Sequence, residues 1–222
     1  MKKICGGLLV ILEGGEGVGK TTHAKALVEY YNSQGYSAKY FREPGGNPLA
    51  EQLRTMILYN EIDVVTETLL FTAARSINVQ KNLLPSLRNG DIIILDRFTK
   101  STLVYQGILK HGDLDFINNC INEVTKDLYA TDEGYSIEFT LLCDPEEAVK
   151  RAQAEGHERN KYDTMTIDKY KIINNAYHDL WRETSGSIPC LINTTKLSQG
   201  DVFKRLVTGI DKILEGCDID DE

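Results

Sequence analysis

The stretch LEGGEGVGKTT, residues 12–22, follows the apolar run LLVI and leads into AKALVEYY. Four of the six residues from position 14 to position 19 are glycines, which give a protein core nothing to pack. Glycine does adopt the positive-φ conformations that turn successive backbone N–H groups inward, and it lets a phosphate approach the main chain closely. The stretch is therefore a candidate for binding phosphate through its backbone.

The pattern inside this stretch is G-x-x-x-x-G-K-[ST], running from Gly14 to Thr21. In such a pattern Lys20 reaches the β- and γ-phosphates of a nucleotide and the Thr21 hydroxyl ligates Mg²⁺. The positive end of the following helix adds to the attraction. The sequence thus predicts a P-loop with Mg²⁺ as cofactor. Its expected nucleotide-binding residues are Gly14, Gly15, Glu16, Gly17, Val18, Gly19, Lys20, Thr21 and Thr22.

Strand and helix patterns alternate along the rest of the chain. Continuous apolar runs, typical of parallel strands covered on both faces, occur at residues 8–12, 92–95, 137–142 and 189–193, with a weaker one at 37–41. Helical patterns occupy residues 21–33, 48–59, 64–88, 101–109, 114–126, 145–154, 167–183 and 201–214. This order predicts one α/β domain over residues 1–222, a three-layer α/β/α P-loop NTPase fold with a parallel sheet of about five strands. A polar stretch at 154–166 and a frayed acidic tail at 215–222 complete it.

Composition excludes several classes of partner. The net charge is −8 and no run of lysine or arginine exceeds two residues, so a nucleic-acid polymer is not an expected partner. No apolar run is long enough to predict a membrane span. The five cysteines are scattered without a CxxC pair, which favours reduced thiols in the cytoplasm. The histidines form no acid–base constellation and are expected on surfaces; they are His23, His111, His157 and His178.

A P-loop by itself predicts nucleotide binding and leaves the reaction open. The sequence NKYD at 160–163 fits the guanine-reading NKxD pattern of GTPases, but it lies in a polar stretch and no DxxG follows a strand. Asp96, in contrast, ends the apolar run 92–95 and precedes Arg97. A carboxylate there can hold the water shell of a metal, and an arginine can grip phosphoryl oxygens with two hydrogen bonds. These residues favour a kinase over a nucleotide-dependent switch.

Several stretches in order resemble the thymidylate kinase family of P-loop nucleoside-monophosphate kinases over nearly the whole chain. They are EGGEGVGKTT, FREPGGNPLAEQLR, LLFTAARSINVQ, DRFTKSTLVYQG and the polar stretch that starts at KRAQAEG. The resemblance implies transfer of the γ-phosphoryl group of ATP to the 5′-phosphate of dTMP, in dTTP biosynthesis, with Mg²⁺ bridging the β- and γ-phosphates. It also implies a homodimer paired through helices, for which 64–84 and 101–109 offer apolar faces.

The resemblance assigns roles at the base end of dTMP. Phe71 would stack on thymine, and Arg75, one helical turn later, would hydrogen-bond its edge. Thr102 and Gln106 would read the remaining edge, and Tyr105 would lie against the sugar. The residues implied to bind dTMP are Glu43, Pro44, Arg54, Phe71, Arg75, Arg97, Ser101, Thr102, Tyr105 and Gln106.

At the phosphate end the resemblance implies that Arg97 and Arg54 hold the 5′-phosphate of dTMP, while Arg42 supports the REPGG turn. That turn commonly contains a cis-proline in the family, here Glu43–Pro44. Glu16 matches an acidic position near the acceptor phosphate or the metal. The residues implied to be catalytic are Lys20, Arg97, Glu16 and Arg159, and those implied to hold the metal are Thr21 and Asp96.

The stretch 154–166 would be a lid that closes over ATP and excludes water. The family supplies a catalytic arginine from the P-loop or from the lid; Gly17 occupies the P-loop position, so the lid must supply the cation. The candidates are Arg151, which is also expected to bind ATP, and Arg159, while Lys161 stands where an arginine is common. Three alternatives stay open: a kinase for dUMP, a modified pyrimidine deoxynucleotide or an unphosphorylated deoxynucleoside; a nucleotide-dependent switch; and a catalytically inactive P-loop module.

Overall fold

In the computed structural model, the five apolar runs form one sheet in the order β3-β4-β2-β5-β6. The strands are β2 (Leu8–Gly14), β3 (Ala38–Arg42), β4 (Ile92–Asp96), β5 (Tyr135–Leu142) and β6 (Ile188–Asn193). All four strand pairings are parallel, which confirms the predicted fold class. The structure describes residues 1–128, 135–154, 161–162, 165–183, 188–217 and 219–221.

Helices occupy the intervals between the strands, close to the predicted ranges. The α-helices are α1 (Lys20–Ser33), α2 (Pro48–Tyr59), α3 (Val64–Asn78), α4 (Leu84–Arg88), α5 (Thr99–Thr102), α6 (Leu114–Thr125), α7 (Pro145–Ala154), α8 (Ile167–Leu180) and α9 (Gln199–Leu214). Two π-helical segments, η1 (Val79–Leu83) and η2 (Leu103–Leu109), and a 3₁₀ turn, η3 (Lys126–Leu128), extend three of them. Within the described residues, no helix has the length and apolar composition needed to cross a membrane.

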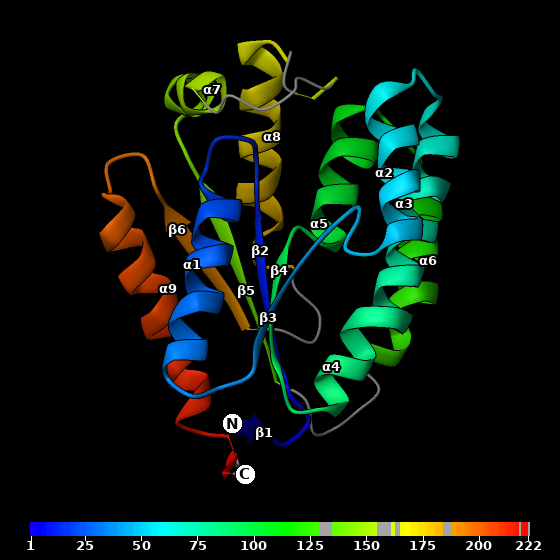
Figure 1. Cartoon of the computed structure of the whole chain (residues 1–222). Coiled ribbons are helices and arrows are strands. Elements are labelled where there is room, and N and C mark those ends of the chain that lie inside the picture. The colour runs from blue at the N-terminus through cyan, green and yellow to red at the C-terminus, as the bar shows by residue number, and fades with distance from the viewer. Residues whose placement is uncertain (129–134, 155–160, 163–164, 184–187, 218, 222) are drawn as a thin grey trace.

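The sheet is the middle layer because successive residues of a strand face opposite sides. On β2, Leu8 and Val10 pack into a core cluster that includes residues of α1 and α9. Their neighbours Leu9 and Ile11 pack into a second cluster with residues of η1 and α4. Figure 1 shows α1 and α9 on one side of the sheet, and α3, α4, α5 and α6 on the other.

The predicted helix 64–88 is not one regular α-helix. It is α-helical to Asn78, widens into the π segment η1, and resumes as α4, which has a proline, Pro85, within its first turn. Proline has no N–H and its ring collides with the carbonyl four residues earlier, so a regular α-helix cannot pass through Pro85. A π segment just before the proline accommodates that break.

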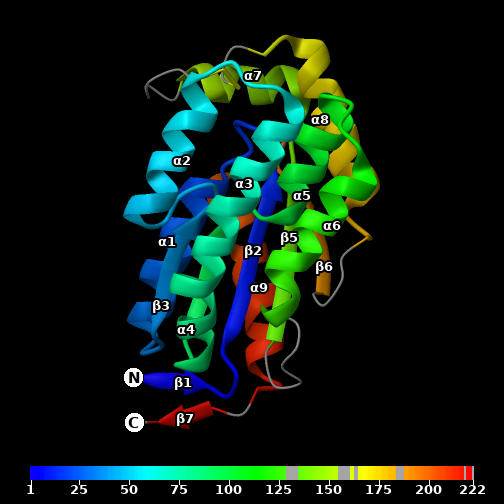
Figure 2. The ribbon, with the colours of Figure 1, turned by 90° about the vertical axis from the view of Figure 1, so that its right-hand side faces the viewer.

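The prediction of a frayed tail at 215–222 is wrong, because part of this segment forms a strand. Residues Ile219–Asp221 form β7, which pairs antiparallel with β1 (Lys2–Ile4), a strand that the sequence did not indicate. Figure 2 shows the two strands side by side at the end of the molecule where both termini lie. The backbone register sets Lys2 opposite Asp221, Lys3 opposite Asp220 and Ile4 opposite Ile219.

The topology determines where a ligand can bind. From β2 the chain passes through α1 to β3, returns to β4 beside β2, and then crosses to β5 on the other side of β2. Connections that leave a parallel sheet in opposite directions open a crevice at the carboxyl ends of the strands. The loop after β2 and the residues after β4 both lie at that edge, which is the upper edge of the sheet in Figure 1.

Candidate active site

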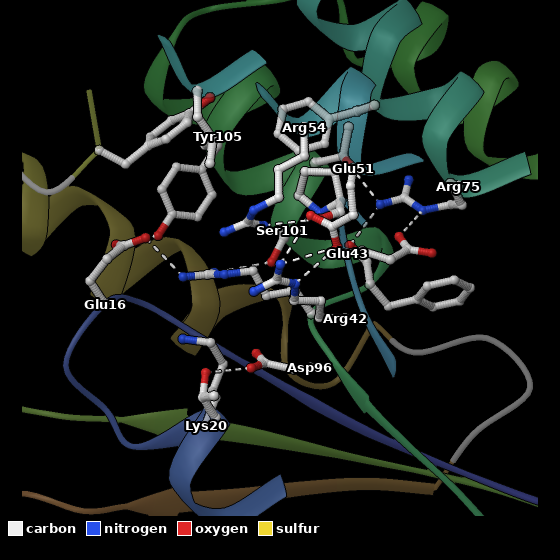
Figure 3. A pocket seen from close by; sticks show the side chains of 18 of the residues that line it. Glu16, Lys20, Arg42, Glu43, Glu51, Arg54, Arg75, Asp96, Ser101 and Tyr105 are labelled. Carbon is white, nitrogen blue, oxygen red and sulfur yellow. Dashed lines mark hydrogen bonds and ion pairs between the residues drawn. The ribbon is translucent and has the colours of Figure 1, made fainter. Parts of the chain in front are cut away.

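A cavity of about 740 Å³ lies at this edge of the sheet. Its wall is built from the loop after β2, the start of α1, the turn after β3, and side chains of α2, α3, α5 and η2 (Figure 3). All ten residues predicted to bind dTMP line it, as do both predicted metal ligands. Of the predicted nucleotide-binding loop, the lining residues are Glu16, Gly17, Gly19, Lys20, Thr21 and Thr22.

The loop after β2 ends at Gly19, whose φ of 93° leads directly into α1. The first residue of that helix, Lys20, is 6% exposed, and its ammonium group donates a short hydrogen bond to the Gly15 carbonyl. Burial first, and then the charge of Arg97, lower the pKa of Lys20 to about 8. Lys20 is thus held at the base of the cavity without an anionic partner strong enough to offset its desolvation.

Gly17 occupies the P-loop position at which the resemblance allowed an arginine, and the structure gives a reason for the glycine. Its φ is +72°, and a Cβ added there would lie 2.2 Å from the carbonyl oxygen of Ala148 in α7. Real atoms do not approach so closely, and L-residues rarely adopt this φ. An arginine at this position would push α7 away from the loop.

Asp96 ends β4 and faces the start of α1. Its Oδ2 atom accepts a hydrogen bond of 2.5 Å from the Thr21 hydroxyl and one of 3.3 Å from the Tyr40 hydroxyl. Tyr40 also lines the cavity, and sequence reasoning missed it because a tyrosine in a weak edge strand carries no distinguishing signal. In the described part of the chain, no three acidic, histidine or cysteine side chains converge as a metal cluster.

Arg97, the residue after β4, has a φ of 70°, which is uncommon for a residue with a side chain. Its backbone N–H donates to the Leu12 carbonyl at 2.9 Å, and its guanidinium pairs with Glu16 Oε1 at 2.8 Å. The other carboxylate oxygen of Glu16 accepts a 2.5 Å hydrogen bond from Tyr105. Backbone strain of this kind persists where surrounding contacts enforce it, and it is found most often at functional sites.

Glu13 supports this corner from below and was missed by the sequence analysis. It is fully buried at the end of β2, and its carboxylate accepts hydrogen bonds from the backbone N–H groups of Phe98 at 2.8 Å and Ser101 at 3.1 Å. The Ser101 hydroxyl also donates to it at 2.7 Å. Glu13 therefore fixes the turn that presents Arg97. An acidic residue directly after five apolar strand residues was the available signal.

At the opposite end of the cavity, Arg75 projects from α3 and is 1% exposed. Its Nε donates to Glu43 Oε2 at 2.7 Å, and its Nη2 donates to the Phe98 carbonyl and the Thr102 hydroxyl, both at 2.9 Å. As an acceptor, the hydroxyl oxygen of Thr102 thus helps to orient Arg75. Within the described part of the chain, Nη1 of Arg75 is buried without a hydrogen-bond partner.

Gln106, on η2, carries a second buried atom of this kind. Its amide nitrogen donates to Glu67 at 2.9 Å and to the Tyr162 hydroxyl at 3.3 Å, while its Oε1 has no partner among the described residues. Buried polar atoms without partners are rare in native proteins and call for an explanation such as a ligand. Arg75 and Gln106, whose Nη1 and Oε1 atoms have no partner within the residues that the structure describes, line the same cavity as Phe71.

The turn after β3 closes the cavity on the α2 side. The Glu43–Pro44 peptide is cis, as the family resemblance implied. Arg54 on α2 donates to the Pro44 carbonyl at 2.9 Å, and Arg42 forms an ion pair with Glu51 at 3.0 Å. Figure 3 shows both arginines beside the Arg75–Glu43 pair. Two cations thus border the space between the P-loop and the base end.

The predicted lid residues have mixed outcomes. Arg159 and His157 lie outside the described residues. Arg151, on α7, is not part of the cavity wall; it pairs with Glu147 at 2.9 Å and donates to the Thr195 carbonyl at 3.2 Å. Tyr162 does line the cavity. Its ring contacts that of Tyr105 edge-on, with the two ring centres 5.4 Å apart.

The prediction that all histidines lie on surfaces is wrong for His23. Its side chain is 5% exposed on the buried face of α1, beside Gly19, and burial lowers its pKa. The face of α1 that points to the sheet begins at Lys20, and His23 lies three residues later on the same face. His111 and His178 are exposed, as predicted.

Comparisons with known proteins agree with the resemblance. The sequence model of the family described as "Thymidylate kinase" matches residues 12–204. The thymidylate kinase of Rickettsia africae is 33% identical over 198 residues, covering 89% of this chain and 93% of its own, and that of Chlorobaculum tepidum is 32% identical over 216 residues, covering 93% and 98%. A crystal structure of thymidylate kinase from Ehrlichia chaffeensis superimposes with a TM-score of 0.67 at 25% identity, covering 94% of this chain and 98% of that one.

Proposed function

The chain belongs to the thymidylate kinase family, and from that premise we propose which of its residues bind the two nucleotides and carry the reaction. The reaction is transfer of the γ-phosphoryl group of ATP to the 5′-phosphate of dTMP, giving dTDP and ADP. In this proposal the ATP phosphates lie in the loop from Gly14 to Thr22, and dTMP extends from Arg97 to Gln106. The cavity wall includes residues from both regions, which supports a shared site.

The phosphate end would act by positioning and charge neutralisation, as phosphoryl transfer requires. Lys20 would contact the β- and γ-phosphates. Their negative charge would favour the charged ammonium group, which burial and Arg97 disfavour in the free protein. Arg97 would hold the acceptor phosphate, and its pairing with Glu16 fixes the direction of its guanidinium. Arg54 lies on the same side, tied to the Pro44 carbonyl, and would share the charge of that phosphate.

Mg²⁺ would be held by Thr21 and Asp96. Their side-chain oxygens lie 2.5 Å apart beside the loop, and hydroxyl and carboxylate oxygens suit this cation. Because Mg²⁺ usually keeps several waters and binds through one or two protein oxygens plus phosphates, this small donor set fits it. The bound ion would neutralise phosphate charge, while Asp96 and Thr21 orient its water shell.

The observation that carries the base assignment is a pair of buried atoms, on Arg75 and Gln106, that have no hydrogen-bond partner in the described part of the chain. Nη1 of Arg75 is a donor and Oε1 of Gln106 is an acceptor. Thymine and uracil present the complement, a carbonyl oxygen next to an N–H group, whereas cytosine presents an amino group next to an unprotonated nitrogen. Phe71 would stack on the ring, and Tyr105, between Glu16 and Tyr162, would lie against the sugar.

The test is ADP release with ATP and saturating Mg²⁺ against dTMP, dUMP, dCMP and thymidine. We expect turnover to be fastest with dTMP, slower with dUMP, which has the same hydrogen-bonding edge but lacks the methyl group, and slowest with dCMP and thymidine. A site that turned over dCMP as well as dTMP would overturn the base assignment. ADP release that is independent of any acceptor would overturn the acceptor site as a whole.

The same proposal includes a homodimer in the cytoplasm. Val65 and Leu69 on α3 and Leu114 on α6 are 51%, 50% and 46% exposed, and these helices contact each other. The predicted contribution of 101–109 does not fit, because most of η2 is buried. Sedimentation velocity should find that the native protein is a dimer and that Leu69→Glu dissociates it. The control Ile172→Glu, at an exposed residue of α8, should leave the dimer intact. A native protein that sediments as a monomer would contradict the proposed dimer.

The proposal also places the protein in the cytoplasm. The free cysteines support a reducing compartment, which cell fractionation would test.

A further inference from the structure

One buried carboxylate near the base end, that of Glu67 on α3, is fully enclosed and is not part of the cavity wall. Its Oε2 accepts hydrogen bonds from Gln106 at 2.9 Å and from Lys110 at 2.6 Å. Its Oε1 accepts one from the Tyr162 hydroxyl at 3.0 Å and another from Lys161. Glu67 therefore joins three separate segments without reaching the space where a nucleotide would lie.

The contacts of Glu67 determine which way the Gln106 amide faces. A carboxylate only accepts hydrogen bonds, so the amide nitrogen of Gln106, and not its oxygen, must lie against Glu67. The second hydrogen of that nitrogen is taken by Tyr162, whose own hydroxyl hydrogen goes to Glu67. With both amide hydrogens used, the oxygen of Gln106 is the atom left for the cavity, and among the described residues it has no partner.

The charge of Glu67 is maintained despite its burial. Lys110 and Lys161 both contact it and are 31% and 26% exposed, so two partly hydrated cations offset one buried anion. Burial favours the neutral form, but the hydrogen bonds from Lys110, Lys161 and Gln106 outweigh it and lower the pKa of Glu67. A neutral amide in place of this carboxylate would offer Gln106 both a donor and an acceptor, and the Gln106 amide could then adopt either orientation.

We propose that Glu67 is a positioning residue that sets the acceptor specificity of this enzyme through Gln106. By holding the amide nitrogen, it presents the amide oxygen to the base, which selects a base with an N–H at that point and rejects one with an unprotonated nitrogen. Thymine and uracil are of the first kind and cytosine is of the second. The inference rests on the proposed function, because it assumes that the base of the acceptor reaches Gln106.

The experiment compares native enzyme with Glu67→Gln, measuring kcat and KM for dTMP and for dCMP at saturating ATP, and ADP affinity by calorimetry. We expect the ratio of kcat/KM for dTMP over that for dCMP to fall roughly tenfold to a hundredfold in Glu67→Gln. The KM for dTMP should carry the change while kcat is largely kept, because the base contact is the same before and during phosphoryl transfer. ADP affinity should stay at the native value.

The matched control is Glu123→Gln on α6, which removes a carboxylate paired with Lys126 where both side chains are largely exposed. It should leave all constants at their native values. The decisive comparison is between the single variant Gln106→Ala and the double variant Glu67→Gln/Gln106→Ala. If Glu67 acts through Gln106, the two will have the same ratio of kcat/KM for dTMP over that for dCMP. An equal change in both backgrounds would assign Glu67 a structural role and overturn the proposal.

Two further outcomes are separable. If the native enzyme does not discriminate dTMP from dCMP, the proposed base site itself is contradicted. If the native enzyme discriminates and Glu67→Gln discriminates equally well, only the role of Glu67 is contradicted. If Glu67→Gln folds poorly, the charge-balanced variant Glu67→Gln/Lys110→Met replaces an ion pair by neutral groups of similar length and must show the same fall in ratio. Loss of ADP affinity together with dTMP affinity in that variant would also overturn the proposal.

Discussion

The two ends of the cavity are built in opposite ways. The phosphate end comes mostly from one contiguous stretch, Gly14 to Thr22, in which the backbone and one lysine face the ligand. The base end is assembled from α3, η2 and Tyr162, which are far apart in the chain. Two buried carboxylates, those of Glu43 and Glu67, hold its side chains in place.

The difference follows from what each end has to recognise. Phosphate is a compact anion, and any row of N–H groups with a cation binds it, so a local turn and a helix start are sufficient. A pyrimidine edge is a directional pattern of donors and acceptors, and side chains that read it must be held in one orientation. The base end therefore needs supporting residues that the phosphate end does not, and the two ends should respond differently to substitution.

The largest effect is expected at the phosphate end, for Arg97→Ala. Loss of the guanidinium that holds the acceptor phosphate should lower kcat by about 10³-fold or more, since an arginine that contacts the reacting phosphoryl groups contributes that much in related reactions. ADP binding in the P-loop should be largely kept, because Lys20 and the loop backbone are untouched. Rapid-quench turnover and ADP calorimetry measure the two quantities. Arg88→Ala, at an exposed arginine of α4, is the control, and loss of ADP binding in Arg97→Ala would mean that the two nucleotide sites are not separable.

An intermediate effect is expected at the base end, for Arg75→Lys. A lysine keeps the charge but has a single nitrogen, so it cannot contact Glu43, Phe98 and Thr102 and still leave a donor for the base. We expect kcat/KM for dTMP to fall roughly a hundredfold, mainly through KM, with ADP affinity unchanged. Steady-state kinetics with dTMP varied would show it. If ADP affinity fell in parallel, the phosphate end and the base end would depend on each other, which would contradict the view that they are built separately.

The smallest effect is a pH dependence of ADP affinity, set by Lys20, whose pKa in the free protein is lowered to about 8. Bound phosphates favour the charged amine and raise its pKa, so the contribution of Lys20 to binding is complete below about pH 8 and is lost as pH rises toward the pKa of the complex. ADP affinity should fall by up to about tenfold per pH unit in that range. Calorimetry from pH 7 to 9.5 tests this, with Lys20→Arg as a control whose cation does not titrate; equal affinity at all pH values in the native protein would refute it.

Sequence patterns predicted the fold well because its determinants are local or repetitive. The apolar runs of β2, β4 and β5 required parallel strands covered on both faces, and the glycine-rich loop required a phosphate ligand. The patterns did not reveal the π segments η1 and η2. The first lies directly before a helix with Pro85 in its first turn, and the second buries Val104 to Gly107 in a row, so a helical pattern in the sequence does not distinguish either from an α-helix. Pairing of β1 with β7 was missed because each strand is three residues long.

Within the site, single residues show the same division. Gly14, Lys20, Thr21 and Asp96 are recognisable by spacing and position, because a turn before a helix and a residue after a strand have defined surroundings. Arg75 and Gln106 were placed only through resemblance to a family. No pattern pointed to the supporting residues Glu13, Tyr40 and Glu67, which contact Ser101, Asp96 and Gln106 respectively. A lone acid in a helix or at a strand end is most often solvated, and the sequence alone does not show which one is buried.

By itself, then, the sequence determined the parallel α/β architecture and the P-loop, since both rest on interactions between residues close in the chain or on repeated apolar patterns. The tertiary structure alone decided the chemistry of the base end. There, packing of α3 against η2 desolvates Glu43 and Glu67, and a buried carboxylate must be satisfied by whichever donors surround it. Those donors, on Arg75 and Gln106, are thereby turned so that one donor and one acceptor in the wall of the cavity have no partner among the described residues.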